Sequence, residues 1–245
     1  MARQAAAPVP QQAAEPGVIG GLALGLVKVL GWLILGLVFS ILVEWLGMSA
    51  FWPEEGVRHS RRMLEAELGY LEGSVPQSLV SADPAGLARR IADTFYHYGF
   101  EITGIATGIQ RLNAPPTSAD STLLRLSRAF YAPVSSYFIA AITITQVYAV
   151  RLAVLLLAMP VFGLAALVGL TDGLVERDRR RFGGARETGF VYHHAKRFVA
   201  PSVAAAWLFY LAWPVSVHPN WVILPAAGLF GLSLAVSAAT FKKHL

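Results

Sequence analysis

The sequence contains no cysteine and has few charged residues. Without Cys, the chain has no disulfides, no thiolate metal ligands and no cysteine nucleophile. Charged residues make up 14% of the chain and hydrophobic residues 55%, whereas soluble domains have a charged fraction of about 25%. The apolar residues lie in long runs rather than in the stripes of a water-facing domain. The composition therefore predicts an integral membrane protein.

Four apolar runs are long enough to cross a hydrocarbon core of about 30 Å as helices. The second run belongs to one long helix, which we expect to be kinked at Pro160. The last two runs are separated only by His218, Pro219 and Asn220, so they form a tight hairpin. We expect an all-α membrane protein with about four transmembrane helices, in residues 18–46, 131–171 and, as a hairpin of helices 3 and 4, 199–241.

Short loops rich in Lys and Arg stay in the cytoplasm, which orients these spans. Residues 172–198 form such a basic loop, and a flexible tail (1–17) and the C-terminus (242–245) fall on the same side. Residues 47–130 then form a small helical periplasmic domain between the first and second spans. Within it, Asp83 is expected to cap a helix that starts at Pro84. The predicted location is a bacterial inner membrane, with both termini cytoplasmic.

Motifs of catalysis are missing from the sequence. It has no G-x-x-x-x-G-K-[ST], no H-E-x-x-H and no G-x-S-x-G, so it lacks a P-loop, a zinc-protease motif and a nucleophile elbow. His193 and His194 are adjacent, and neighbours on a helix point about 100° apart, which disfavours a shared metal ion. We expect no enzyme activity and no cofactor. Glu44 and Arg151 are a candidate membrane ion pair.

Two stretches carry a resemblance to a known family. One is DGLVERDRRRFGGARETGFVYHHAKR, from Asp172 to Arg197, and the other is PEEG-x-x-HS-x-x-ML-x-x-E-L-x-YL, from Pro53 to Leu71. Together with the first span and the final hairpin, they resemble a membrane protein family of integrating conjugative elements and related plasmids. Its genes commonly lie beside the type IV coupling protein, the hexameric ATPase that feeds DNA to the type IV secretion channel. The resemblance implies an accessory role that anchors or regulates this ATPase, in an oligomer or hetero-complex with it or other channel proteins.

The basic loop is the candidate partner-binding site. Its Arg side chains can form bidentate pairs with carboxylates, and Gly183 and Gly184 would turn the chain back between two helices. The other interpretation is that the Arg residues only set topology and contact anionic lipid. A small transporter or channel subunit, a periplasmic sensor and direct DNA handling without sequence specificity are the alternative functions. The candidate residues are Arg177, Arg179, Arg180, Arg181, Phe182, Gly183, Gly184, Arg186, Glu187, Tyr192, His193, His194, Lys196 and Arg197.

Overall fold

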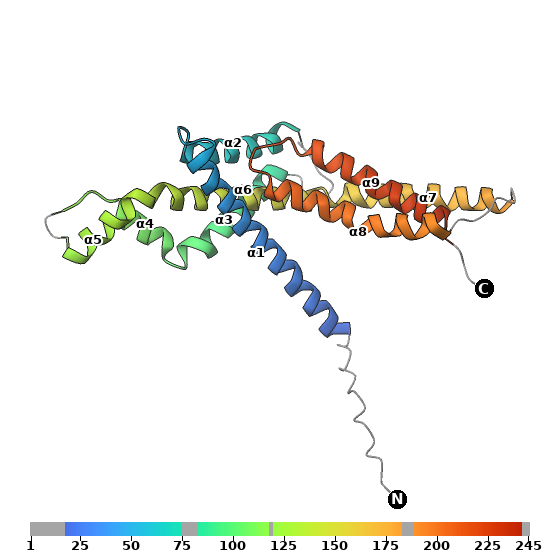
Figure 1. Cartoon of the computed structure of the whole chain (residues 1–245), viewed down its shortest axis with the longest axis horizontal. Coiled ribbons are helices and arrows are strands. Elements are labelled where there is room, and N and C mark those ends of the chain that lie inside the picture. The colour runs from blue at the N-terminus through green and yellow to red at the C-terminus, as the bar shows by residue number, and fades with distance from the viewer. Residues whose placement is uncertain (1–17, 75–82, 118–119, 183–188, 242–245) are drawn as a thin grey trace, which may run out of the picture. The chain divides into compact units, whose positions relative to one another are not determined.

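The computed structural model describes residues 18–74, 83–117, 120–182 and 189–241, and all regular structure in these ranges is helical (Figure 1). This confirms the all-α prediction. The helices are α1 (Val18–Ala50), α2 (Val57–Ser74), α3 (Pro84–Tyr96), the π-helix η1 (His97–Glu101), α4 (Ile105–Asn113), α5 (Thr122–Tyr131), the 3-10 helix η2 (Ala132–Val134), α6 (Ser135–Leu157), α7 (Met159–Phe182), α8 (Gly189–Ala212) and α9 (Asn220–Ala239).

Three helical segments of the described chain are long and apolar enough to cross a membrane: Gly20–Ala50, Thr122–Arg180 and Asn220–Ala239. The chain divides into two compact units, and the boundary after Leu35 lies within α1. In the first unit, the apolar side chains of α1 are exposed on all sides, as Leu22, Leu26 and Trp32 illustrate. A helix that is apolar all round requires an apolar surrounding.

The second apolar segment is longer than one crossing needs. At about 1.5 Å per residue, α6 and α7 each span roughly 35 Å. The helix is interrupted at Ala158, two residues before Pro160, where the sequence predicted a kink. Proline has no backbone N–H to donate within a helix, and it disfavours helical geometry in the residue before it. The expected long helix is thus two helices in succession, and α7 continues past residue 171 to Phe182.

The fourth expected span, residues 199–217, is not among the three candidate segments. Its helix, α8, ends at Ala212, so about 14 of the expected residues are helical, roughly 21 Å at the usual rise. Lys196 and Arg197 precede this apolar part. A crossing by α8 remains a prediction.

Helices α2 and α3 cover α6, and residues 36–50 of α1 also contact it. We call this assembly the α6 layer. Its apolar core contains Met63, Ile144 and Val147, with Ile41 and Leu64 packed against them. The N-cap of α3 was predicted from the sequence: the Asp83 carboxylate accepts a hydrogen bond from the Gly86 N–H at 2.8 Å.

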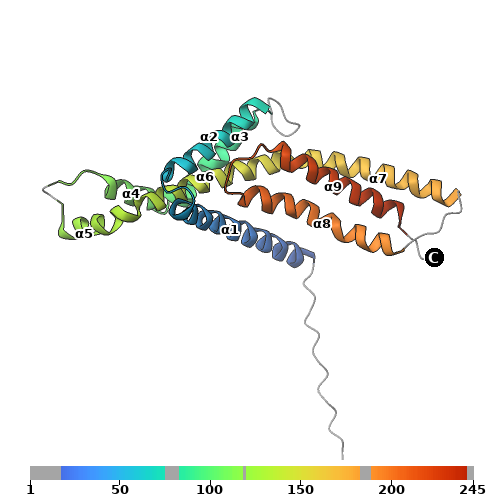
Figure 2. The same cartoon turned by 45° about the horizontal axis from the view of Figure 1, so that its top comes forward.

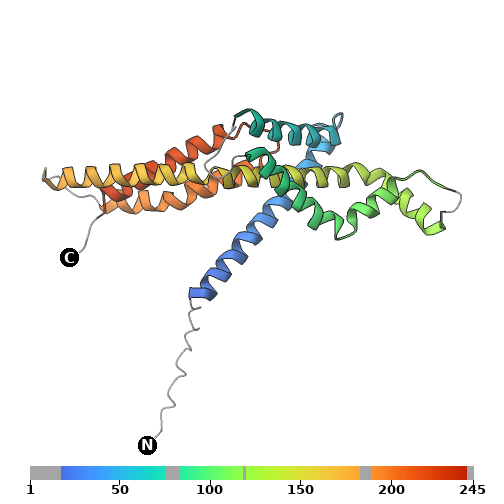
Figure 3. The same ribbon diagram turned by 180° about the vertical axis from the view of Figure 1, so that it is seen from behind.

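The second assembly, the α7–α9 bundle, has α9 packed against both α7 and α8 (Figure 2). Small residues set the spacing of α7 and α9. A Cβ atom on Gly169 would lie 2.2 Å from the carbonyl oxygen of Gly231, and one on Gly173 would lie 2.3 Å from that of Ala235. The backbones therefore touch, as in small-residue packing of membrane helices. Seen from behind, the bundle and the α4–α5 pair lie at opposite ends of α6 (Figure 3).

Candidate functional site

The first half of the predicted basic loop is the C-terminal end of α7. Four arginines and Phe182 lie in its last two turns. Glu176 accepts a hydrogen bond from Arg180 at 3.0 Å and one from Arg179 at 3.5 Å. A Glu four residues before an Arg supports a helix, and cations near its C-terminus oppose the negative end of its dipole. These local interactions explain why the helix continues into sequence that was expected to be a loop.

Charge at this end of α7 is mixed rather than uniformly basic. Residues 172–182 contain four Arg and three carboxylates. Arg179 and Arg180 are exposed, with 78% and 45% of their side chains open to solvent. Phe182 is 94% exposed. Arg177 turns inward, with its guanidinium 5.9 Å from the ring centre of Phe241. The result is an exposed aromatic ring beside arginines already oriented by a carboxylate.

The second half of the predicted loop is the start of α8. His194, Lys196 and Arg197 are exposed there, and Phe198 beside them is 64% exposed. We call the exposed residues of both helix ends, Arg179, Arg180, Phe182, Lys196, Arg197 and Phe198, the basic element. The structure places Arg181, Tyr192 and His193 in these helices without describing their side chains, and the remaining candidates, Gly183, Gly184, Arg186 and Glu187, lie outside the described residues.

A second cluster of polar side chains is buried where the α6 layer meets the α7–α9 bundle. The guanidinium of Arg151, on α6, donates from Nε to Oε1 of Glu67, on α2, at 2.8 Å, and its Nη2 lies 2.8 Å from the same oxygen. The hydroxyl of Tyr210, on α8, donates to the other oxygen of Glu67 at 2.8 Å. None of the three residues is more than 2% exposed.

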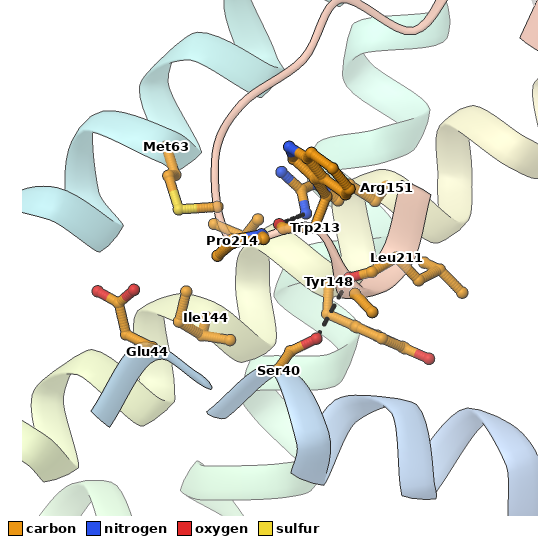
Figure 4. Close-up of a pocket in the computed structure, with 11 residues that line it drawn as sticks. Ser40, Glu44, Met63, Ile144, Tyr148, Arg151, Leu211, Trp213 and Pro214 are labelled. Atoms are coloured by element: carbon orange, nitrogen blue, oxygen red, sulfur yellow. Dashed lines mark hydrogen bonds between the residues drawn. The ribbon is translucent and has the colours of Figure 1, made fainter. Parts of the chain in front are cut away.

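The remaining hydrogen bonds of Arg151 go to the connection between α8 and α9. Its Nη1 donates to the Trp213 carbonyl at 2.5 Å (Figure 4). Its Nη2 donates to the Val215 carbonyl at 2.9 Å. The guanidinium also lies 5.5 Å from the ring centre of Tyr210. A buried charge is tolerated only when it is paired and hydrogen-bonded, and this one is. We call Glu67, Arg151, Tyr210 and the two carbonyls the junction cluster.

The structure corrects the expected ion pair of Glu44 and Arg151, because the two residues do not pair with each other. Both residues line the same small cavity (Figure 4), but each has another partner in the described part of the chain. Glu44 contacts Nδ1 of His59 at 3.0 Å, and His59 stacks on Trp52 with ring centres 4.1 Å apart. The sequence singled out Glu44 and Arg151, and the structure buries both, but their partners come from α2, whose placement could not be read from spacing along the chain.

Glu67 was missed, although the sequence holds a signal for it. Ser60, Met63, Glu67 and Leu71 recur at helical spacing and are all buried. A carboxylate on such a stripe requires a buried partner. Burial raises the pKa of Glu67 above its ordinary value, and the charge of Arg151 and the Tyr210 hydrogen bond oppose that rise. No cluster of three metal-ligating side chains occurs in the described residues.

These features define a class: an α-helical protein with helices long enough to span a membrane, a buried ion pair at the junction of its two assemblies, and an exposed basic and aromatic helix end. Over residues 51–242, the chain matches the family described as IncC plasmid conjugative DNA transfer protein DtrJ-like, and it belongs to that family. This confirms the resemblance to conjugative-element proteins. Searches of curated proteins and of solved structures gave no match.

Proposed function

We propose that this protein is a non-catalytic, multi-pass component of the bacterial inner membrane that binds the type IV coupling protein and anchors or regulates it during conjugative DNA transfer. The family supports a role in DNA transfer. Three apolar helical segments support a membrane location. The coupling protein is the partner that the resemblance of the sequence implies.

The basic element is the proposed contact, and the observation that carries it is Phe182, which is 94% exposed beside Arg179 and Arg180. Aromatic and Arg side chains dominate the binding energy of protein interfaces. A surface that serves only to attract anionic lipid needs neither the exposed ring nor the interspersed carboxylates. The mixed charge also disfavours DNA, whose binding depends on many unpaired cations.

A pull-down tests the proposal. The coupling protein is recovered with the tagged full-length chain after mild detergent extraction, and again with a variant in which Arg179, Arg180 and Arg181 are replaced by Ser. We expect recovery to fall at least about tenfold, because a few interface residues hold most of the binding energy. A matched control replaces Arg61 and Arg125, which are also exposed but lie on α2 and α5.

The outcomes separate the alternatives. Loss with the α7 variant and full recovery with the control support the basic element. Equal recovery with all three proteins excludes it as the contact. If vesicles with anionic lipid bind the unaltered chain but not the variant, while the coupling protein is recovered with both, the arginines contact lipid instead.

A further inference from the structure

The α6 layer and the α7–α9 bundle are each held by their own packing. In the layer, Met63 contacts Ile144 and Val147. In the bundle, Gly169 meets the backbone at Gly231, and the ring of Phe162 lies 6.0 Å from that of Phe230. Backbone contacts of this kind leave little freedom within either assembly. Any relative motion of the two assemblies would therefore occur at the junction between them.

The two assemblies are joined covalently at Ala158, between the end of α6 and the start of α7. At Ala158 the helix changes its hydrogen bonding, and the Ala158 N–H is shared between the carbonyls of Val154 and Leu156. Pro160 has no N–H with which to continue the ladder. A proline break within an otherwise continuous helical path is a common cause of bending.

Polar contacts join the two assemblies beside this break. Besides the junction cluster, the Ser216 hydroxyl donates to the Met63 carbonyl at 3.2 Å, and the Ser40 hydroxyl donates to the Leu211 carbonyl at 3.2 Å. The rings of Tyr70 and His218 lie 5.1 Å apart. A cavity of about 10 Å³ remains between these groups, which is close to the smallest space that holds one water.

A buried ion pair contributes less to stability than well-packed apolar residues would, because both ions lose their hydration. In some proteins, a buried ion pair instead favours one packing arrangement of the helices over the alternatives. In the junction cluster, Glu67 and Arg151 come from the α6 layer, whereas Tyr210 and the two carbonyls come from α8 and the connection that follows it. The network is complete only when the two assemblies are together.

We propose that the junction cluster is a latch on a hinge at Ala158–Pro160. During DNA transfer, the latch opens and the α6 layer separates from the connection between α8 and α9. This rests on the proposed function. The latch holds the resting arrangement, and its opening alters the direction of α7 and thus of the basic element at its far end. Events outside the membrane are thereby coupled to the partner inside.

Cross-linking tests the need for opening. Since the chain has no Cys, Tyr70→Cys with His218→Cys creates one defined pair across the junction, which a cleavable thiol-reactive cross-linker joins in cells. We expect transfer frequency to fall about tenfold or more, because the open state is removed, and to recover when the linker is cleaved. The matched control is Glu72→Cys with Arg89→Cys, an exposed ion pair within the α6 layer, and its cross-link leaves transfer unchanged.

Distance measurements test the latch independently of transfer. Spin labels at Arg61→Cys on α2 and Leu229→Cys on α9, both exposed, report the separation of the two assemblies in vesicles. Glu67→Gln removes the charge and Tyr210→Phe removes one hydrogen bond. We expect both variants to broaden the distance distribution. Pro160→Ala restores the missing N–H and narrows it, whereas Pro225→Ala, at a proline inside α9, leaves it unchanged.

Each outcome has a distinct meaning. If deleting the gene leaves transfer normal, the proposed function fails. If deletion abolishes transfer but the Tyr70–His218 cross-link does not lower it, the junction is a static joint and the latch is refuted. Unchanged distances in Glu67→Gln and Tyr210→Phe refute it as well.

Discussion

Removing one member of the buried ion pair is expected to destabilise the protein far more than removing both. Among the described residues, Arg151→Leu leaves the buried Glu67 carboxylate with the Tyr210 hydroxyl, and Glu67→Leu leaves the guanidinium with two carbonyls and the Tyr210 ring but no carboxylate. Breaking a buried pair in this way costs about 3–5 kcal/mol in the free energy of unfolding. Replacing both residues by Leu is often close to neutral, so the coupling between the two substitutions amounts to several kcal/mol.

The assay is unfolding of the purified chain in detergent, followed by fluorescence of its six Trp. The exposed pair Arg89 and Glu72 is the control, and each Leu substitution there changes stability by about 1 kcal/mol or less. Arg151→Leu with Glu44→Leu should be close to additive, because these residues have different partners. Additive effects for Glu67 and Arg151 would refute the ion pair, and strong coupling of Arg151 with Glu44 would restore the pairing expected from the sequence.

Further predictions follow from local geometry. Gly169→Ala puts a Cβ against the Gly231 carbonyl and should destabilise the chain by about 1–3 kcal/mol. Gly163→Ala on the same helix meets nothing within 4 Å and should be neutral or slightly stabilising. Equal thermal shifts of the two variants in detergent would contradict the close packing of α7 and α9. Asp83→Ala removes the cap of α3 and should cost about 1 kcal/mol in the unfolding assay, so an unchanged midpoint would count against it. Arg177→Cys should react with an impermeant maleimide only after the inner membrane is opened, and labelling of intact spheroplasts would overturn the orientation.

The family relationship shows where sequence reasoning was strong. The stretch from Pro53 to Leu71, quoted for the resemblance, supplies His59, Met63, Glu67 and Tyr70 to the contacts around the junction. The stretch from Asp172 to Arg197 supplies the exposed ends of α7 and α8. Both segments were singled out by the family resemblance, and the structure places them differently: one faces inward toward the junction, and the other has its exposed residues at the helix ends.

The sequence by itself determined the helical class, three of the four expected apolar segments, the Asp83 cap and the break near Pro160. Each of these depends on neighbours within a few turns, through hydropathy, capping geometry or the missing proline N–H. Only the tertiary structure decided that Arg151 pairs with Glu67 rather than Glu44, since the partner lies 84 positions away and Tyr210 lies 143 positions from Glu67. Burial of a charge can be inferred from a run of apolar residues, but the choice of its partner depends on which helices pack together.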